Sequence, residues 1–268
     1  MNETVSENTI LDNILIVLVG TTHPGNIGAV ARAMKTMGLR RLHLVNPKRF
    51  PCAEATARAA GADDVLYGAR VFDALPLALA DCQWVVGTSA RIRGIRWPEL
   101  AIRECGGQTV AMAGNGQVAL VFGREHSGLA NEELDLCHAV MRIPTNPAYR
   151  SLNLASAVQI AAYEIRMALP DEPTAEPTTP ISSDADAISV SEREGLYRHL
   201  EESLQEIGYY DPEKPKKLMR RLRRFFNRAN PDRSELNILR GILSAAQKAA
   251  RRAPDPPECK DALRPTGR

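Results

Sequence analysis

The 268-residue sequence lacks the features that mark metal-binding, disulfide-rich and membrane-spanning proteins. Its five cysteines are scattered without a C-x-x-C pair, which is typical of reduced thiols. Its five histidines are equally dispersed, so we expect no metal site. No apolar run reaches ~18 residues, so no membrane-spanning helix is predicted. The first residues are polar and acidic, unlike a signal peptide, and we expect a cytoplasmic protein.

Charge is nearly balanced overall, at a formal net +2, but it is unevenly distributed. Residues 1–169 carry 16 Lys and Arg against 15 Asp and Glu, whereas residues 191–252 carry 15 against 9. Between them, residues 171–190 hold three prolines and five acidic residues, which is typical of a flexible linker. This pattern predicts a first domain over 1–170, a linker over 171–190, a helical domain over 191–252 and a disordered tail over 253–268.

The first domain alternates apolar strand-like runs with helical segments, which predicts an α/β fold with a parallel sheet covered by helices on both faces. Its first run is continuously apolar, as in a strand buried on both faces. The expected strands are Ile14–Val19, Arg41–Val45, Trp84–Thr88, Val118–Phe122 and Ala139–Ile143, with short extended pieces at Val65–Leu66 and Arg70–Val71. The expected helices are Ile27–Met37, Ala53–Ala60, Asn131–Cys137 and one capped by Asn153, with a short helix or turn at Pro98–Cys105.

Four polar loops follow strands of this sheet, where ligands of open parallel sheets bind. They are Gly20–Gly28, Thr88–Arg91, Gly123–Leu129 and Pro144–Leu152. The first loop lacks the lysine of a Walker nucleotide-binding loop and a complete G-x-G-x-x-G dinucleotide-binding fingerprint. The third loop lacks the G-x-S-x-G motif of a catalytic serine, so Ser127 is not predicted to be a nucleophile and we interpret His126 as a surface residue. Each loop, taken alone, could equally be a simple turn at the end of a strand, and Arg32, taken alone, is explained by a surface salt bridge. Because all four loops follow strands of a parallel sheet, they lie at the same edge, and together they predict one ligand site.

The second domain is predicted to contain three helices, at Glu192–Ile207, Lys216–Ala229 and Leu236–Ala250. Capping pairs are expected at Ser191/Glu194 and Asp232/Glu235. Residues 214–228 hold eight Lys and Arg and no acid. Helical periodicity places Leu218, Leu222, Phe225 and Ala229 on one face, and Lys217, Arg220, Arg221, Arg224 and Arg228 on the other. A solvated surface usually includes acids, so this face favours binding to nucleic-acid phosphates.

Three segments closely resemble the motifs of the SPOUT superfamily of knotted methyltransferases, in its TrmH-like branch. They are NIGAVAR at 26–32, VFGREHSGL at 121–129 and IPTNPAYRSLNLASAV at 143–158. The resemblance implies a trefoil knot in the sheet, S-adenosylmethionine as cofactor and a homodimer. The helical extension, with LNILRGIL at 236–243, narrows it to members that methylate the ribose of the pyrimidine nucleotide at position 32 in the tRNA anticodon loop.

The same resemblance implies roles for individual residues. It makes Arg32 the catalytic arginine, with Asn26 shaping the same loop. The implied cofactor contacts are Thr88, Ser89, Ala90, Gly123, Ile143, Arg150, Ser151 and Leu152. Two alternatives stay open: a sibling enzyme that methylates a ribose elsewhere in tRNA or rRNA, and a non-catalytic tRNA-binding protein.

Overall fold

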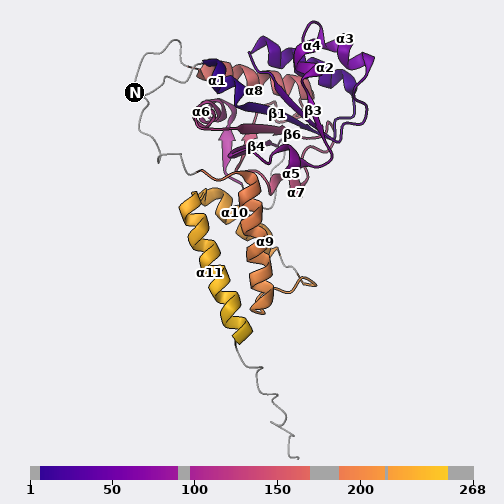
Figure 1. The fold of residues 1–268 in the computed structure, drawn as a ribbon. Coiled ribbons are helices and arrows are strands. Elements are labelled where there is room, and N and C mark those ends of the chain that lie inside the picture. The colour runs from indigo at the N-terminus through magenta and orange to yellow at the C-terminus, as the bar shows by residue number, and fades with distance from the viewer. Residues whose placement is uncertain (1–6, 90–96, 170–186, 215–216, 253–268) are drawn as a thin grey trace, which may run out of the picture.

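The computed structural model describes residues 7–89, 97–169, 187–214 and 217–252 (Figure 1). Its core is a seven-stranded sheet in which every pair of neighbours is parallel, in the order β3-β2-β1-β6-β4-β7-β5. The strands are β1 (Ile14–Val19), β2 (Arg41–Val45), β3 (Arg70–Phe72), β4 (Trp84–Thr88), β5 (Glu99–Ala101), β6 (Val118–Phe122) and β7 (Ala139–Arg142). The predicted α/β class is confirmed. The knot stays a prediction, because strand order does not specify how loops thread.

The strand β1 is buried on both faces, as its sequence predicts. Ile16 and Leu18 point into the core on one side of the sheet, and Val17 and Val19 into the core on the other. The first side is covered by α1 (Glu7–Asp12), α2 (Pro24–Thr36), α3 (Ala53–Ala59), α4 (Asp63–Tyr67), α6 (Ile102–Ala113) and α8 (Leu154–Ala168), and the second by α5 (Leu75–Ala78) and α7 (Asn131–Leu134). Figure 1 shows α2, α3, α4 and α8 above the sheet and α5 and α7 below it.

The helix α2 begins earlier than predicted, so the second half of the expected loop Gly20–Gly28 is helical. Pro24 stands in its first turn, where proline presets a helical φ and loses no hydrogen bond. Gly28 packs against α3, since a Cβ there would lie 2.0 Å from the carbonyl oxygen of Ala55. This glycine therefore serves close helix packing.

Several boundaries differ from those expected. Val65–Leu66 belongs to α4 rather than to an extended piece, and α7 ends at Leu134 instead of Cys137. The stretch Pro98–Cys105 contains the edge strand β5 and the start of the twelve-residue helix α6. Two glycines disfavour α6 locally, but Gly106 lets α6 approach α8, because a Cβ there would lie 2.6 Å from the carbonyl oxygen of Glu164. The short helices α1 and α5 were not expected.

The C-terminal part contains three long helices, α9 (Val190–Glu206), α10 (Leu218–Ala229) and α11 (Arg233–Arg252). The cap of α9 is formed by Ser189 and Glu192, two residues before the predicted pair. Both pairs fit the S-x-x-E pattern, and burial of the flanking Ile188 and Val190 selects the earlier one. The predicted cap of α11 is confirmed, because the backbone N–H of Glu235 donates to Asp232 Oδ1 at 2.8 Å.

The end of the predicted linker is packed against the sheet. The backbone N–H of Val190 donates to the carbonyl oxygen of Cys82 at 2.9 Å, and its side chain joins the core beneath the sheet. Residues 170–186 of the linker region and the tail 253–268 lie outside the described residues. The described cysteines Cys52, Cys82, Cys105 and Cys137 are free thiols, as expected. In the described ranges, no helix is long and apolar enough to cross a membrane.

Candidate active site

A cavity of about 690 Å³ opens at the carboxyl ends of β4, β6 and β7. Its walls come from three of the four predicted loops. The predicted cofactor residues that line it are Thr88, Ser89, Gly123, Ile143, Arg150, Ser151 and Leu152. Ala90 lies outside the described residues. The structure thus brings the described members of the predicted set to one cavity, and their role in binding a cofactor stays a prediction.

The loop after β6 folds back on itself at the cavity wall. Arg124 and Gly128 exchange two backbone hydrogen bonds, of 3.3 and 2.9 Å. Gly123 lies under this turn, and a Cβ there would come within 2.2 Å of the carbonyl carbon of Gly128. Any larger residue at position 123 would therefore displace the turn and change the shape of the cavity.

A carboxylate joins three motif segments beside the cavity. Glu125 accepts hydrogen bonds from the backbone N–H of Thr22 at 3.1 Å, the Thr22 hydroxyl at 2.9 Å and the backbone N–H of His23 at 3.2 Å. It also accepts one from the side-chain amide of Asn26 at 2.9 Å. The Asn26 carbonyl oxygen in turn accepts from the amide of Asn153, at 3.1 Å. The Asn153 side chain also caps α8, as predicted.

The electrostatics of Glu125 follow from these partners. Partial burial raises the pKa of Glu125, but hydrogen bonds from Asn26 and from backbone N–H groups outweigh this effect and lower the pKa to about 2. Glu125 is therefore ionised at neutral pH. The sequence places Glu125 among the polar groups at this edge of the sheet, but we had predicted no role for it, although it is the only acidic residue in the four loops.

The predicted catalytic arginine lies on α2, apart from the cavity lining. Arg32 is exposed and follows Asn26 by six residues on the same helix, which is about 9 Å along the axis. It is not among the residues that line the cavity. The contacts of Asn26 and Glu125 fix the start of α2, and therefore the helix that carries Arg32.

The predicted basic face of α10 divides into two parts. Lys217, Arg221 and Arg228 are exposed and Arg224 is half-buried. Arg220 instead forms an ion pair with Asp135, with Nε 2.7 Å from Oδ2. Of the five predicted RNA-binding residues, Arg220 is thus already paired with an acid of the first domain, and its role in RNA binding stays a prediction. Phe225, expected on an apolar packing face, is 52% exposed.

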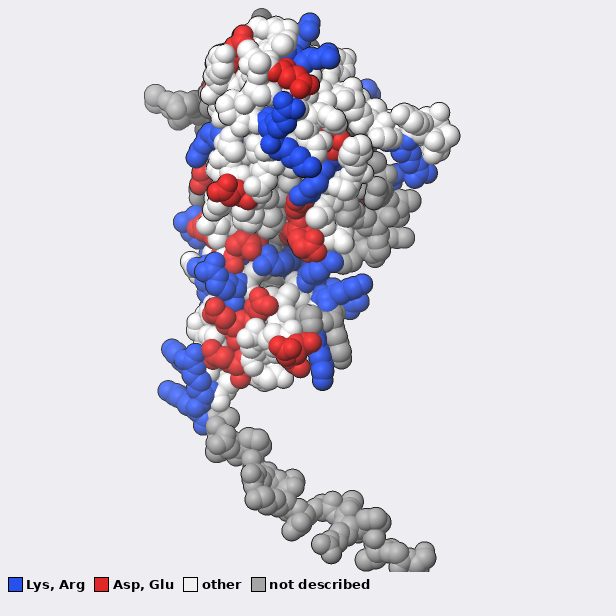
Figure 2. All heavy atoms as spheres, turned by 90° about the vertical axis from the view of Figure 1, so that its right-hand side faces the viewer, with Lys and Arg blue, Asp and Glu red and all other residues white. Residues whose placement is uncertain are grey.

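Acids from other elements explain this division. Arg223 on α10 pairs with Glu194 of α9, and Arg233 of α11 pairs with Glu192. Figure 2 shows basic and acidic side chains intermixed where the lower, helical part of the molecule meets the upper part. Residues 214–228 contain no acid, but their partners come from distant parts of the chain.

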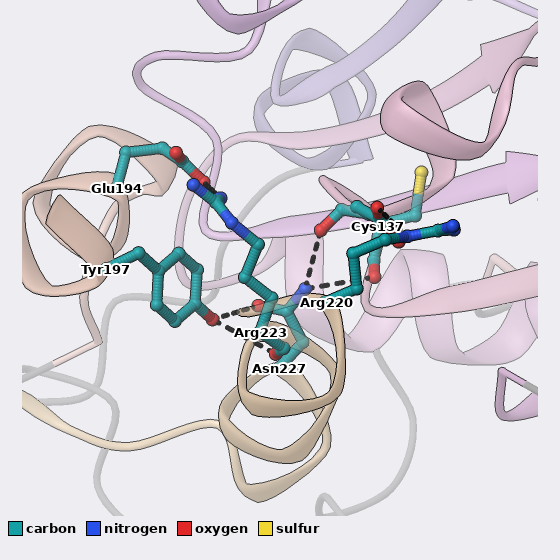
Figure 3. A network of polar contacts seen from close by, with 7 residues as sticks. Cys137, Glu194, Tyr197, Arg220, Arg223 and Asn227 are labelled. Atoms are coloured by element: carbon teal, nitrogen blue, oxygen red, sulfur yellow. Dashed lines mark hydrogen bonds and ion pairs between the residues drawn. The ribbon is translucent and has the colours of Figure 1, made fainter. Parts of the chain in front are cut away.

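Polar contacts fix α10 to the rest of the molecule (Figure 3). The Asn227 side chain donates to the carbonyl oxygens of Asp135 and Cys137, at 3.1 and 3.3 Å. The Tyr197 hydroxyl donates to Asn227 Oδ1 at 2.6 Å, and the Arg223 guanidinium lies 4.6 Å from the centre of the Tyr197 ring. These contacts lie just before β7, so the helical part docks at the amino ends of the strands, away from the cavity.

A buried pair lies beside this contact. Arg193 of α9 contacts His138 and donates to Asn230 Oδ1 at 3.0 Å. Burial, followed by the positive charge of Arg193, lowers the pKa of His138 well below its ordinary value. This histidine is therefore neutral at physiological pH. Within the ranges that the structure describes, no cluster of three or more His, Cys, Asp or Glu could hold a metal ion.

Comparison with known proteins identifies the family of each part of the chain. Residues 13–163 match the SpoU rRNA Methylase family. The chain belongs to the SpoU methylase family. Residues 191–255 match the C-terminal domain of the tRNA methyltransferase TrmJ. SpoU methylase motifs therefore supply both the cavity and the helix that carries Arg32, and a separate module supplies the C-terminal helices.

Individual relatives align with most of the chain. A tRNA (cytidine/uridine/adenosine-2′-O-)-methyltransferase TrmJ from Pseudomonas aeruginosa is 51% identical over 250 residues, 90% of this chain and 96% of that protein. A tRNA (cytidine/uridine-2′-O-)-methyltransferase TrmJ from Pectobacterium atrosepticum is 52% identical, over 89% of this chain and 98% of that protein. The protein in the crystal structure of TrmJ from Z. mobilis ZM4 is 33% identical, and the two structures superpose with a TM-score of 0.74 over 86% of this chain and 97% of that one.

Proposed function

We propose that the chain is an S-adenosylmethionine-dependent methyltransferase that modifies the ribose 2′-oxygen of cytidine or uridine at position 32 of tRNA. The observation that carries the proposal is that two motif segments line one cavity and the third is hydrogen-bonded to both of them through Asn26, in a chain whose C-terminal helices match the TrmJ domain. The relatives named above act on tRNA cytidine and uridine, and they align with both parts of the chain.

The cavity fits the proposed cofactor in its chemistry. Ile143, Leu152 and Met141 offer an apolar wall for the adenine ring, and Thr88 and Ser89 offer polar groups. Gly123 keeps the wall open, because a Cβ there would meet the Gly128–Leu129 backbone. These residues, with Ser151 and Arg150, would hold the cofactor. When bound, it supplies a sulfonium methyl group and leaves as a neutral thioether.

The residues of the chain then have to position the ribose hydroxyl and ease the loss of its proton. An arginine side chain stays protonated under physiological conditions, so Arg32 is a poor general base. Its guanidinium grips the phosphate beside the target ribose and holds the 2′-hydroxyl in line. The proton passes to a phosphate oxygen or to water. Such positioning can lower a barrier by ~7–11 kcal/mol.

The proposal includes two partners. Arg221, Arg224, Arg228 and Lys217 on α10 bind tRNA phosphates, in the cytoplasm where tRNA is found. A second copy of the chain completes a homodimer. The large apolar side chains of Tyr163 and Met167 are 48% and 62% exposed on α8, and they support an interface on that helix.

Mass spectrometry of tRNA after incubation with the full chain and methyl-labelled S-adenosylmethionine tests the function. We expect label on the 2′-oxygen of nucleotide 32, in transcripts that carry either C or U there. Label at another ribose, or on rRNA in place of tRNA, would indicate a sibling activity. Tight tRNA binding without any label would indicate a non-catalytic binding protein.

A further inference from the structure

Tyr149 is a large aromatic residue left open to solvent beside the cavity. It lies in the loop between β7 and α8 and is 75% exposed. Within the described residues its ring has no aromatic partner. Other tyrosines, such as Tyr67, are equally exposed, and what distinguishes Tyr149 is its place beside the cavity, where an aromatic face can contact a ligand.

The loop holds Tyr149 in a fixed turn. The backbone N–H of Tyr149 donates to the carbonyl oxygen of Asn146 at 2.9 Å, and the backbone N–H of Ala148 donates to Asn146 Oδ1 at 2.9 Å. Pro147 presets its own φ, and its carbonyl oxygen accepts a bond from Arg150 Nε at 3.2 Å. A ring on such a turn loses little conformational freedom when it binds a partner.

The turn lies at the rim of the cavity. Thr145 before it, and Arg150, Ser151 and Leu152 after it, line the cavity, whereas Tyr149 does not. Its ring is therefore next in sequence to the cavity lining but outside the space proposed for the cofactor. Arg150 adds a positive charge at the same rim, which attracts a phosphate backbone.

We propose that the Tyr149 ring stacks on the base of the nucleotide whose ribose is methylated. The inference rests on the proposed function and assigns Tyr149 to substrate positioning. An anticodon-loop base is single-stranded and can leave its stack to lie on an aromatic side chain. Stacking uses the face of the base, which every base offers, so Tyr149 accepts cytidine and uridine alike.

Substitutions at Tyr149 in the full-length chain test the proposal, with tRNA transcripts that carry C or U at the target position. Tyr149→Ala should lower kcat/KM by ~5- to 150-fold, the equivalent of ~1–3 kcal/mol of stacking, and by the same factor for both bases. Tyr149→Phe and Tyr149→Trp keep a ring and should stay within about threefold of wild type. The matched control is Tyr67→Ala, which removes an equally exposed tyrosine from α4, a helix away from the cavity.

Further readouts separate stacking from other roles. The affinity for S-adenosylmethionine by calorimetry, the melting temperature and the sedimentation coefficient should be the same for Tyr149→Ala and wild type. Wild-type kcat/KM in Tyr149→Ala would overturn stacking, and so would equal losses in the Phe and Ala variants. A parallel loss of cofactor affinity or of the dimer would assign the ring to those contacts. Absence of tRNA methylation by the wild-type chain would instead refute the proposed function and this inference with it.

Discussion

The carboxylate of Glu125 accepts a 2.9 Å hydrogen bond from the side-chain amide of Asn26, across a sequence separation of 99 residues. Asn26 connects this carboxylate to Asn153, so one chain of side chains crosses from the loop after β6 through α2 to the start of α8. The cavity walls and the helix that carries Arg32 are therefore held together by polar contacts as well as by the core.

Replacing Glu125 by Ala should weaken both folding and turnover. The change leaves the Asn26 amide and the backbone N–H groups of Thr22 and His23, which lead into α2, without their acceptor, and hydrogen bonds to a charged group contribute ~1.5–3 kcal/mol each. We expect a lower melting temperature and a fall in methylation of about tenfold or more. Glu132→Ala, which removes an exposed acid seven residues away, is the control and should change neither. Equal effects of the two substitutions would contradict the role given to Glu125.

The acid stability of the chain should depend on the same carboxylate. Because the pKa of Glu125 is lowered from 4.5 to about 2 on folding, its ionised form stabilises the native state fully above pH ~4.5. This contribution is lost as the pH falls toward 2. The difference in unfolding free energy between wild type and Glu125→Gln should therefore shrink over this range in urea titrations. A difference that is constant from pH 7 to pH 2.5 would mean that Glu125 is not held as an anion.

Arg32→Ala should abolish turnover and leave cofactor binding intact. Arg32 does not line the cavity, so calorimetry with S-adenosylmethionine should give the wild-type affinity. Arg32→Lys keeps the positive charge but loses the planar guanidinium, which can form two hydrogen bonds to one phosphate. We therefore expect only partial activity in this variant. Arg40→Ala, at another exposed arginine of the first domain, serves as the control. Turnover near the wild-type rate in Arg32→Ala would refute its positioning role.

The sequence predicted the layers of the fold better than its polar contacts. The apolar, β-branched run Ile14–Val19 is typical of a strand buried on both faces, and loops after parallel strands share an edge, so the cavity was predictable. The partner of Arg220 was not, because Asp135 lies 85 residues earlier and local charge counting cannot include it. Likewise, two overlapping S-x-x-E patterns could each form the N-terminal cap of α9, and only the burial of Ile188 and Val190 decides between them.

The outward basic residues of α10 should govern tRNA affinity. Reversing Lys217, Arg221 and Arg224 to Glu should weaken tRNA binding in gel-shift assays and flatten its dependence on salt, since each lost phosphate contact lowers the slope by about one. Cofactor affinity should not change, because the helix docks at the opposite edge of the sheet from the cavity. Unchanged affinity and slope would place the tRNA site elsewhere.

Arg220 should behave differently from its neighbour Arg221, although both belong to the same basic run. Its guanidinium bonds both oxygens of Asp135, whose side chain is only 12% exposed, so Arg220→Ala leaves a largely buried carboxylate unpaired. We expect Arg220→Ala to lower the unfolding free energy more than Arg221→Ala does. In a double-mutant cycle with Asp135→Ala, the coupling should be ~0.5–3 kcal/mol.

The salt dependence of tRNA affinity should also distinguish the two arginines, but here the larger effect is expected for Arg221→Ala. The slope of this dependence should fall in Arg221→Ala and stay at the wild-type value in Arg220→Ala, because Arg220 is already engaged by Asp135 when tRNA arrives. An equal fall in both variants, together with no coupling to Asp135, would mean that Arg220 leaves its partner for a phosphate. The contact between α10 and the residues before β7 would then open on tRNA binding, and the helical part would not be a fixed platform.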